Sequence, residues 1–257
     1  MITIAVTNQK GGVGKTTCCV NLSAELGRLG HRVLVVDTDP QGNCSSGLGH
    51  DRESSPKSLY DILIDGSEIQ DVVVETPWEG VSLVPANINL AGAEVELSSA
   101  ISRESRLKGS LSTVEDLYDI AIVDCPPSLG LLTVNALVAA KRLLIPIQCE
   151  YYALEGVGQL ARTVDLVRQY LNPNLNMDGI VLTMFDSRTR LANDVVAEVR
   201  EGFGEAAFDT LIPRNVTLSE APSYGKPISY YQENCKGALA YRELAREVEG
   251  RWLREDL

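Results

Sequence analysis

Short apolar runs alternate along this chain with longer stretches in which apolar residues recur every three or four positions. The runs predict buried strands at 2–6, 32–37, 81–84, 120–124, 143–147, 179–183 and 208–212. The periodic stretches predict helices at about 17–29, 89–114, 130–140, 154–171, 190–202 and 237–253. Alternation of strand and helix over the whole length predicts an α/β fold with a mostly parallel, twisted sheet and helices on both faces. We expect a single domain over residues 1–257, with the helix at 237–253 packed on it.

The polar residues of interest collect where the predicted strands end. Thr7, Asp37, Asp124 and Thr183 each follow or close an apolar run. Because open parallel sheets bind ligands beyond the carboxyl ends of their strands, we expect the functional site at this edge.

Composition limits the possible functions. The formal net charge of −12 opposes binding to a polyanion unless basic residues gather on one face. Six cysteines without a C-x-x-C pair suit reduced thiols better than disulfides or a metal site. The N-terminus lacks the basic region of a signal peptide, and no apolar run is long enough for a membrane span. A cytoplasmic protein is expected.

A glycine-rich turn joins the first strand to the first helix. Backbone N–H groups and the positive end of the helix converge there, which is a geometry that binds phosphate. Lys15 is expected to reach the terminal phosphates of a nucleoside triphosphate, and the Thr16 hydroxyl to ligate Mg²⁺. The expected phosphate-binding residues are Lys10, Gly11, Gly12, Val13, Gly14, Lys15, Thr16 and Thr17.

The turn departs from the usual P-loop pattern. Gln9 stands where the first glycine would fall, and a second lysine, Lys10, precedes the paired glycines. The string Lys-Gly-Gly-Val-Gly-Lys-Thr resembles the deviant Walker A motif of the ParA/MinD family of ATPases. In that family the first lysine crosses a dimer interface to the partner's ATP. The resemblance implies an ATP-dependent homodimer in which Lys10 and Lys15 act in catalysis; the alternative is a solvated lysine on a tight turn.

Two acids follow the second strand in the segment Asp-Thr-Asp-Pro-Gln-Gly-Asn, residues 37–43. The segment is similar to the first switch region of ParA proteins. The resemblance assigns Asp39 to orienting the attacking water and places Asp37 in the Mg²⁺ environment. The alternative is that both acids cap a turn, which Asp-Pro favours.

Asp124 ends the apolar run 120–124 and is interpreted as the Walker B acid that holds a Mg²⁺-bound water. The following Cys-Pro-Pro-Ser-Leu-Gly, residues 125–130, resembles the second switch of the family. Cys125 invites comparison with the iron–sulfur cluster of the nitrogenase iron protein, but no matching pair of cysteines is found, and a buried structural thiol is preferred.

The resemblance also places a base pocket at the far side of the sheet. The segments that form the family's adenine slot correspond here to Met184, Pro213 and Asn215. No guanine-type Asn-Lys-x-Asp string occurs, which favours ATP over GTP.

Two segments resemble the DNA-binding face of chromosomal ParA proteins, also called Soj. Arg188 matches one arginine of that face, whereas Thr217 replaces the other. Further cations that could compensate for the loss are Arg190, Arg214, Lys226 and Lys236. We therefore expect nonspecific binding to double-stranded DNA, weakened by Thr217; the alternative is that these are ordinary solvated charges.

The C-terminal helix bears on the choice between DNA and membrane. MinD-type relatives grip membranes with a terminal amphipathic helix that carries basic residues beside apolar ones. Here acids nearly balance the arginines, so we expect the helix on the domain core and no membrane partner.

The resemblance to ParA extends from Ile2 to about Arg246. The chain starts at the first strand and looks like the short chromosomal type, without the N-terminal DNA-binding extension of some plasmid relatives. The family implies a slow ATPase that segregates chromosomes or plasmids on the nucleoid with a ParB-like partner. The alternatives are a positioning factor for a protein cargo and a MinD-like division regulator at the membrane. A metabolic ATPase or a redox reductase has the least support.

Overall fold

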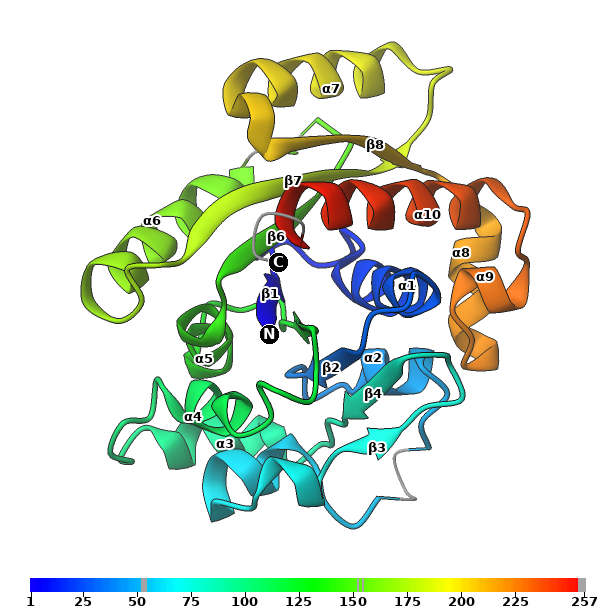
Figure 1. Ribbon diagram of the computed structural model, residues 1–257. Coiled ribbons are helices and arrows are strands. Elements are labelled where there is room, and N and C mark those ends of the chain that lie inside the picture. Colours follow the sequence, from blue (N-terminus) through cyan, green and yellow to red (C-terminus); the bar gives the residue numbers. More distant parts are fainter. Residues whose placement is uncertain (52–54, 152, 154, 254–257) are drawn as a thin grey trace.

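A single twisted sheet runs through the molecule, with helices packed on both of its faces (Figure 1). The computed structural model describes residues 1–51, 55–151, 153 and 155–253. Its eight strands lie in the order β3-β4-β2-β5-β1-β6-β7-β8. Their bounds are β1 Ile2–Val6, β2 Val33–Asp37, β3 Val74–Glu75, β4 Val81–Val84, β5 Ile120–Asp124, β6 Arg142–Gln148, β7 Asn176–Phe185 and β8 Ala207–Pro213. Every described pair is parallel except β3 with β4, which confirms the predicted fold class.

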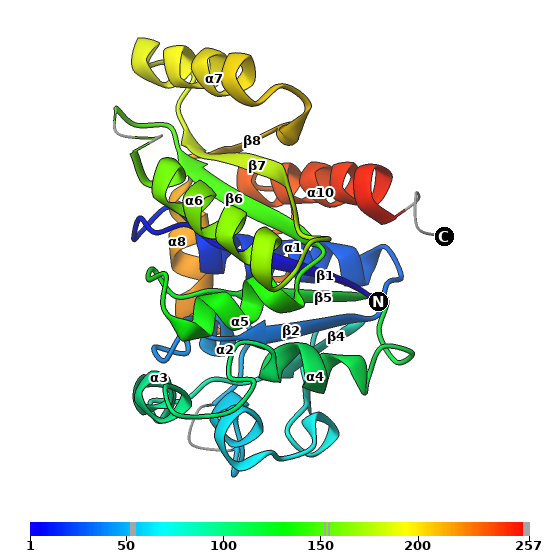
Figure 2. The same cartoon turned by 90° about the vertical axis from the view of Figure 1, so that its left-hand side faces the viewer.

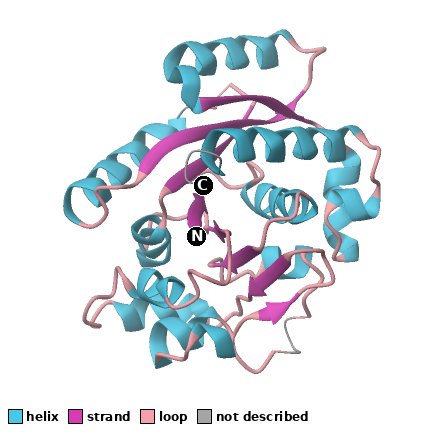
Figure 3. Cartoon of the chain, in the orientation of Figure 1, coloured by secondary structure: helices cyan, strands magenta, loops and turns pink. Residues whose placement is uncertain are grey.

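The helices form two layers, one on each face of the sheet (Figures 2 and 3). On one face lie α3 Leu90–Leu97, α4 Arg106–Ser112, α5 Leu131–Ala139, α6 Glu155–Tyr170 and α7 Arg190–Phe203. On the other lie α1 Lys15–Arg28, α2 Asn43–Gly47, α8 Val216–Glu220, α9 Ile228–Tyr231 and α10 Lys236–Val248. Alternate residues of each central strand face opposite layers, so Ala5 joins one core and its neighbours Ile4 and Val6 the other.

The predicted helix at 89–114 is wrong, because the chain forms two helices there. Between α3 and α4 the Ser98 hydroxyl donates to the Val95 carbonyl at 2.6 Å, and the Ser105 hydroxyl to the Ser102 carbonyl at 3.1 Å. Ser102 has a left-handed φ of 53°. Serine side chains that bond to nearby backbone groups compete with the hydrogen bonds of a helix. The helix is therefore interrupted here, although apolar residues keep recurring at helical spacing. The sequence also missed β3 and the short helices α2, α8 and α9.

The C-terminal helix α10 packs against α1 and β8. Tyr241, Leu244 and Val248 are buried on its inner side. Beyond it, Trp252 meets Phe208 edge to face, with ring centroids 5.3 Å apart. None of the helices in the part of the chain that the structure describes is both long and apolar enough to cross a bilayer.

Two glycines bring the segment after α2 against the turn that follows residues 221–224. A Cβ on Gly49 would lie 2.9 Å from the Gly225 carbonyl oxygen, and a Cβ on Gly225 would lie 2.8 Å from the Gly49 Cα. Both residues have positive φ, 83° and 60°. Neither a side chain nor an ordinary L-residue conformation fits at this contact.

Candidate nucleotide-binding site

The loop between β1 and α1 folds around its own lysine. The Lys15 ammonium donates to the Lys10 carbonyl at 3.1 Å, and Lys15 is only 7% exposed. Gly12 and Gly14 have φ values of 75° and 95°, a region that glycine enters without steric cost. Thr183, near the carboxyl end of β7, fixes the loop by donating its hydroxyl to the Val13 carbonyl at 2.8 Å.

The first turn of α1 contacts the end of β5 through Thr16 and Asp124. The Thr16 hydroxyl donates to Asp124 Oδ2 at 2.8 Å, and Asp124 is fully buried. A threonine hydroxyl beside a carboxylate is an oxygen set that suits Mg²⁺. Within the described residues no cluster of three or more His, Cys, Asp or Glu could hold a metal. The set fits an ion that keeps waters and phosphate oxygens as its other ligands.

Asp37 and Asp124 lie side by side on neighbouring strands. Asp37 Oδ2 accepts from the Ser45 amide at 2.8 Å and the Ser45 hydroxyl at 2.7 Å, and Oδ1 from the Asp39 amide at 3.1 Å. Asp37 therefore holds the loop that leads to α2. Burial raises the pKa of Asp37 to about 6 and, together with the charge of Asp37, the pKa of Asp124 to about 8. Burial also lowers the pKa of Lys15.

Asp39 lies two residues beyond the end of β2 and is half-buried. Its Oδ1 accepts from the Gln41 amide at 2.9 Å, and the Gly42 amide donates to its carbonyl at 2.8 Å. The turn thus uses one carboxylate oxygen and the carbonyl of Asp39.

The raised carboxyl pKa values predict how stability depends on pH in EDTA without nucleotide. A carboxyl whose folded pKa lies above its unfolded value, about 3.9, binds its proton more tightly in the folded protein. Its stabilising contribution is therefore complete below pH 4 and lost as pH rises through the folded pKa, here up to about pH 8. Relative to Asp124→Asn, the wild type should lose roughly 4 kcal/mol of unfolding free energy between pH 5 and pH 8.5, measured by urea denaturation. Parallel pH profiles of the two proteins would contradict this origin.

A cavity of about 370 Å³ opens beside the phosphate loop and contains the predicted base-pocket residues. Met184, Pro213 and Asn215 line it together with Gly14 and Thr17. Met184 has a left-handed φ of 53°, which is uncommon outside glycine and concentrates at ligand sites. Asn215 caps α8 by accepting from the Leu218 amide at 3.3 Å, which fixes its orientation at the cavity wall.

Lys10 lies at the surface beside Glu150. Its ammonium is 4.0 Å from Glu150 Oε2, and the Arg214 guanidinium is 3.3 Å from Glu150 Oε1. The Lys10 side chain is 34% exposed, in contrast to the enclosed Lys15. Exposed ion pairs are weak, so Lys10 can leave Glu150 for another anion.

The cations predicted to bind DNA fall into two places. Arg188, Arg190 and Arg214 lie around the carboxyl ends of β7 and β8, whereas Lys226 lines a cavity of about 340 Å³ beside Thr16 and Thr17. The Arg188 side chain is 87% exposed and makes two hydrogen bonds to Asp186, of 2.9 and 2.7 Å. This pairing lowers the pKa of Asp186 to about 2.

The other two arginines also have acidic partners. Arg190 is 3.6 Å from Asp194, and Arg214 contacts Glu150. A DNA phosphate would have to compete with these carboxylates, which adds to the weakening expected from Thr217.

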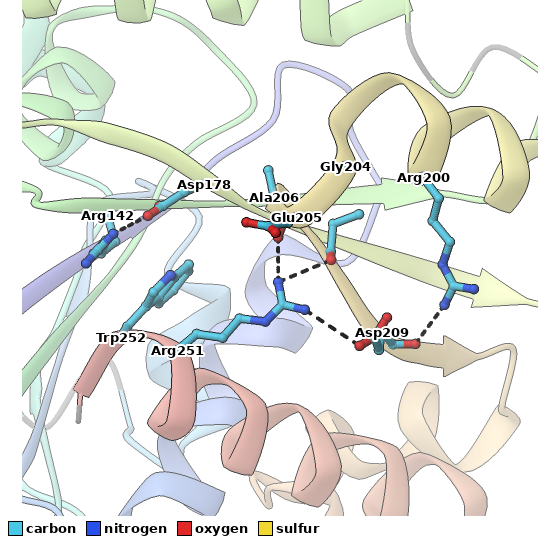
Figure 4. Close-up of a pocket in the computed structure, with 10 residues that line it drawn as sticks. Arg142, Asp178, Arg200, Gly204, Glu205, Ala206, Asp209, Arg251 and Trp252 are labelled. Carbon is cyan, nitrogen blue, oxygen red and sulfur yellow. Dashed lines mark hydrogen bonds and ion pairs between the residues drawn. The ribbon is translucent and has the colours of Figure 1, made fainter. Parts of the chain in front are cut away.

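A larger cavity, about 680 Å³, lies at the opposite ends of β6 and β7 (Figure 4). Arg142 pairs with Asp178, and Arg251 contacts Asp209 at 3.8 Å. Arg200 donates to the Asp209 carbonyl at 3.1 Å. Since these cations are met by acids and carbonyls of the same chain, the cavity has no excess charge that would select an anion.

Some residues of the site were missed by the sequence prediction. Ser45 holds Asp37 from a helix that apolar periodicity did not reveal, and Thr38 donates its hydroxyl to the Asp124 carbonyl at 2.6 Å. Glu150, which follows β6, was also missed. The position of Glu150 just past the carboxyl end of a predicted parallel strand is the one signal that could have found it.

The comparisons with known proteins agree with this geometry. A family model described as an AAA domain matches residues 1–177. The sporulation initiation inhibitor protein Soj of Bacillus subtilis is 54% identical, over 95% of this chain and 97% of its own length. The chromosome partitioning protein ParA of Myxococcus xanthus is 52% identical, over 95% of this chain and 87% of its own.

A solved structure extends the agreement to three dimensions. It is described as cobyrinic acid a,c-diamide synthase from Mycobacterium smegmatis with bound ADP and magnesium. The TM-score is 0.86 at 41% identity, covering 98% of this chain and 95% of the other. With a mostly parallel sheet, a two-lysine phosphate loop and relatives of this similarity along nearly its whole length, the chain belongs to the ParA/Soj family of chromosome-partitioning ATPases.

Proposed function

We propose that this protein is an ATP-driven dimerisation switch that segregates chromosomal or plasmid DNA. The observation that carries the proposal is the grouping of Lys15, Thr16, Asp124 and Asp39 at one edge of the sheet, with the partly exposed ammonium of Lys10 beside them. ATP would occupy the phosphate loop and the cavity at Met184, Pro213 and Asn215.

The roles follow from the contacts of each residue. The Lys15 ammonium is already aimed into the loop and would exchange the Lys10 carbonyl for phosphate oxygens. Thr16 and Asp124 would hold Mg²⁺, with Asp37 as the neighbouring acid, and the ion would neutralise charge on the phosphates. Asp39 would orient the attacking water. The backbone amides of the loop and of the first turn of α1 would donate to the phosphates. These are the amides of Gly11, Gly12, Val13, Gly14 and Thr17.

Dimerisation would use the exposed lysine. Lys10 would leave Glu150 and contact the phosphates of a second subunit, whose backbone would pass close to Gly11 and Gly12. Within the part of the chain that the structure describes, no heavy atom other than those of the adjacent residues lies within 4 Å of a Cβ built on either glycine, which leaves room for a partner's backbone. The ATP dimer would bind nucleoid DNA nonspecifically through Arg188, Arg190, Arg214 and Lys226, in the cytoplasm, until a ParB-like partner stimulates slow hydrolysis.

The test is binding of Asp39→Ala protein to random-sequence duplex DNA across a salt series, with ATP, with ADP and without nucleotide. Removing the acid should trap the ATP dimer, so we expect DNA binding with ATP alone. Each phosphate contact should contribute roughly one unit to the slope of log affinity against log salt. Binding that ignores the nucleotide, or none at all in a protein that dimerises with ATP, would overturn the DNA part of the proposal.

A matched pair of variants sharpens this test. Arg188→Ala should reduce the salt slope by roughly one unit, and Thr217→Arg should raise it by a similar amount. Thr217 is partly exposed on α8, so an arginine fits there without entering the core. A steeper slope in Thr217→Arg would also show that this face meets DNA.

The same experiments distinguish this proposal from two other functions of the family. A positioning factor for a protein cargo would share the ATPase core, and ATP-dependent dimerisation without DNA binding favours it. Co-sedimentation with liposomes in ATP would favour a MinD-like regulator. The synthase name of the structural relative suggests an amidation, but the relatives of 54% and 52% identity are named for sporulation control and chromosome partitioning.

A further inference from the structure

The helix that follows the 125–130 loop begins without a cap of its own. Its N-cap residue is Gly130, which offers no side chain, and no acid lies in its first turn. The first amides of a helix have no partner within the helix and need acceptors from elsewhere. The first amides of α5 therefore depend on acceptors from water or from another element.

Glu94 on α3 supplies that acceptor. Its Oε1 accepts from the Leu132 amide at 3.5 Å. A Cβ built on Gly130 would lie 1.9 Å from the same oxygen and 2.7 Å from the Glu94 Cδ, so the carboxylate fills the space that a side chain would need. Both helices lie on the same face of the sheet (Figure 2). The negative charge also lies at the positive end of α5.

Helix α3, which carries Glu94, is anchored by its buried side. Leu90, Ala93 and Leu97 are buried in the core beneath it, which leaves Glu94 at the boundary facing α5. Glu96, two residues further, accepts from the Tyr60 hydroxyl at 3.0 Å on another side of the helix. The two acids of one helix thus have different partners.

The first turn of α5 is in turn bonded to the loop before it. The Thr133 hydroxyl donates to the Ser128 carbonyl at 2.6 Å, and the Val134 amide to the Gly130 carbonyl at 3.0 Å. At its other end the loop starts at Cys125, whose amide donates to the Val6 carbonyl at 3.1 Å. The loop that follows Asp124 is therefore held at both ends, and Glu94 contacts its C-terminal end at Gly130.

We propose that Glu94 is a positioning residue for ATP turnover, acting through α5 on the 125–130 loop. The contacts described for Glu94 are with Gly130 and Leu132 at the start of α5, so its effect on the site would pass through the helix. The inference rests on the proposed function, because the loop matters for turnover only if this site hydrolyses ATP.

The first experiment compares Glu94→Ala with Glu96→Ala as the matched control. Loss of the cap should speed hydrogen exchange of the amides at 131–134 roughly fivefold, and lower kcat by about the same factor with KM unchanged. Glu94→Gln keeps an acceptor oxygen and should restore most of both values. Unchanged exchange in Glu94→Ala overturns the cap, and unchanged kcat with faster exchange overturns the positioning role.

A second variant tests the contact from the other side. Gly130 has φ −79° and ψ −170°, which alanine adopts freely, and the three heavy atoms nearest to an added Cβ all belong to the Glu94 carboxylate. Gly130→Ala should displace that carboxylate and reproduce Glu94→Ala, and adding it to Glu94→Ala should have no further effect. Additive effects in the double variant would contradict the shared contact. A protein that hydrolyses no ATP would overturn the proposed function, while the exchange comparison would still decide whether Glu94 caps α5.

Discussion

Replacing Lys15 with alanine is expected to weaken ATP binding at least about 100-fold, measured by calorimetric titration of the purified protein. The ammonium is enclosed by the loop, and its partner in the structure is the Lys10 carbonyl at 3.1 Å. No other ammonium of the described residues is enclosed in this loop, so a neighbour cannot replace its contact with phosphate.

The fold should survive the loss of Lys15. Burial lowers the pKa of Lys15, which means that the ammonium is held at a desolvation cost, so its removal relieves that cost while the loop loses one hydrogen bond. Circular dichroism and the urea midpoint should therefore match the wild type. Lys226→Ala is the control, because Lys226 is exposed in the adjoining cavity beside Thr16 and Thr17. ATP affinity within about threefold of wild type in Lys15→Ala would contradict the assigned role.

Lys10→Ala should separate binding from turnover. The single subunit should keep its ATP affinity within about threefold, because the Lys10 side chain points to Glu150 at the surface and not into its own loop. ATP-dependent dimerisation, followed by sedimentation velocity, should be lost, and turnover should fall at least about 100-fold, since a cation supplied in trans to phosphate typically contributes that much or more.

The control for Lys10 keeps the lysine and removes its partner. Glu150→Ala leaves the ammonium in place and frees it from a carboxylate 4.0 Å away. If Lys10 must leave Glu150 to reach a second subunit, this variant should dimerise at least as well as the wild type. Lys10→Ala protein that still dimerises with ATP would show that the lysine is an ordinary surface charge.

The parts of the site that are contiguous in sequence were predictable. The phosphate loop is one strand, one turn and one helix, so the spacing of Gly11 to Thr16 already contains its geometry. The shared edge of the acids required only the rule that open parallel sheets bind ligands beyond the carboxyl ends of their strands, and Asp37 and Asp124 do lie on neighbouring strands. The order of the strands was not predicted.

The parts of the site that depend on contacts between residues far apart in the sequence were not predictable. Ser45 satisfies Asp37 from a five-residue helix, too short for apolar periodicity to reveal. The break between α3 and α4 depends on serine hydroxyls that donate to backbone carbonyls. The pattern of apolar residues contains no information about these hydrogen bonds. The pairing of Arg188, Arg190 and Arg214 with carboxylates likewise emerges only when the loops are in place.

The close approach of Gly49 and Gly225 has a consequence for how this fold can change over time. Each position excludes a side chain because of backbone atoms of the other, so enlarging one cannot be offset by shrinking its neighbour, which is already the smallest residue. Positive φ at both removes the remaining freedom. The segment after α2 and the turn after residues 221–224 can therefore change only together during evolution. Insertions and larger residues are excluded at this contact, and sequence variation is expected on the surrounding surface instead.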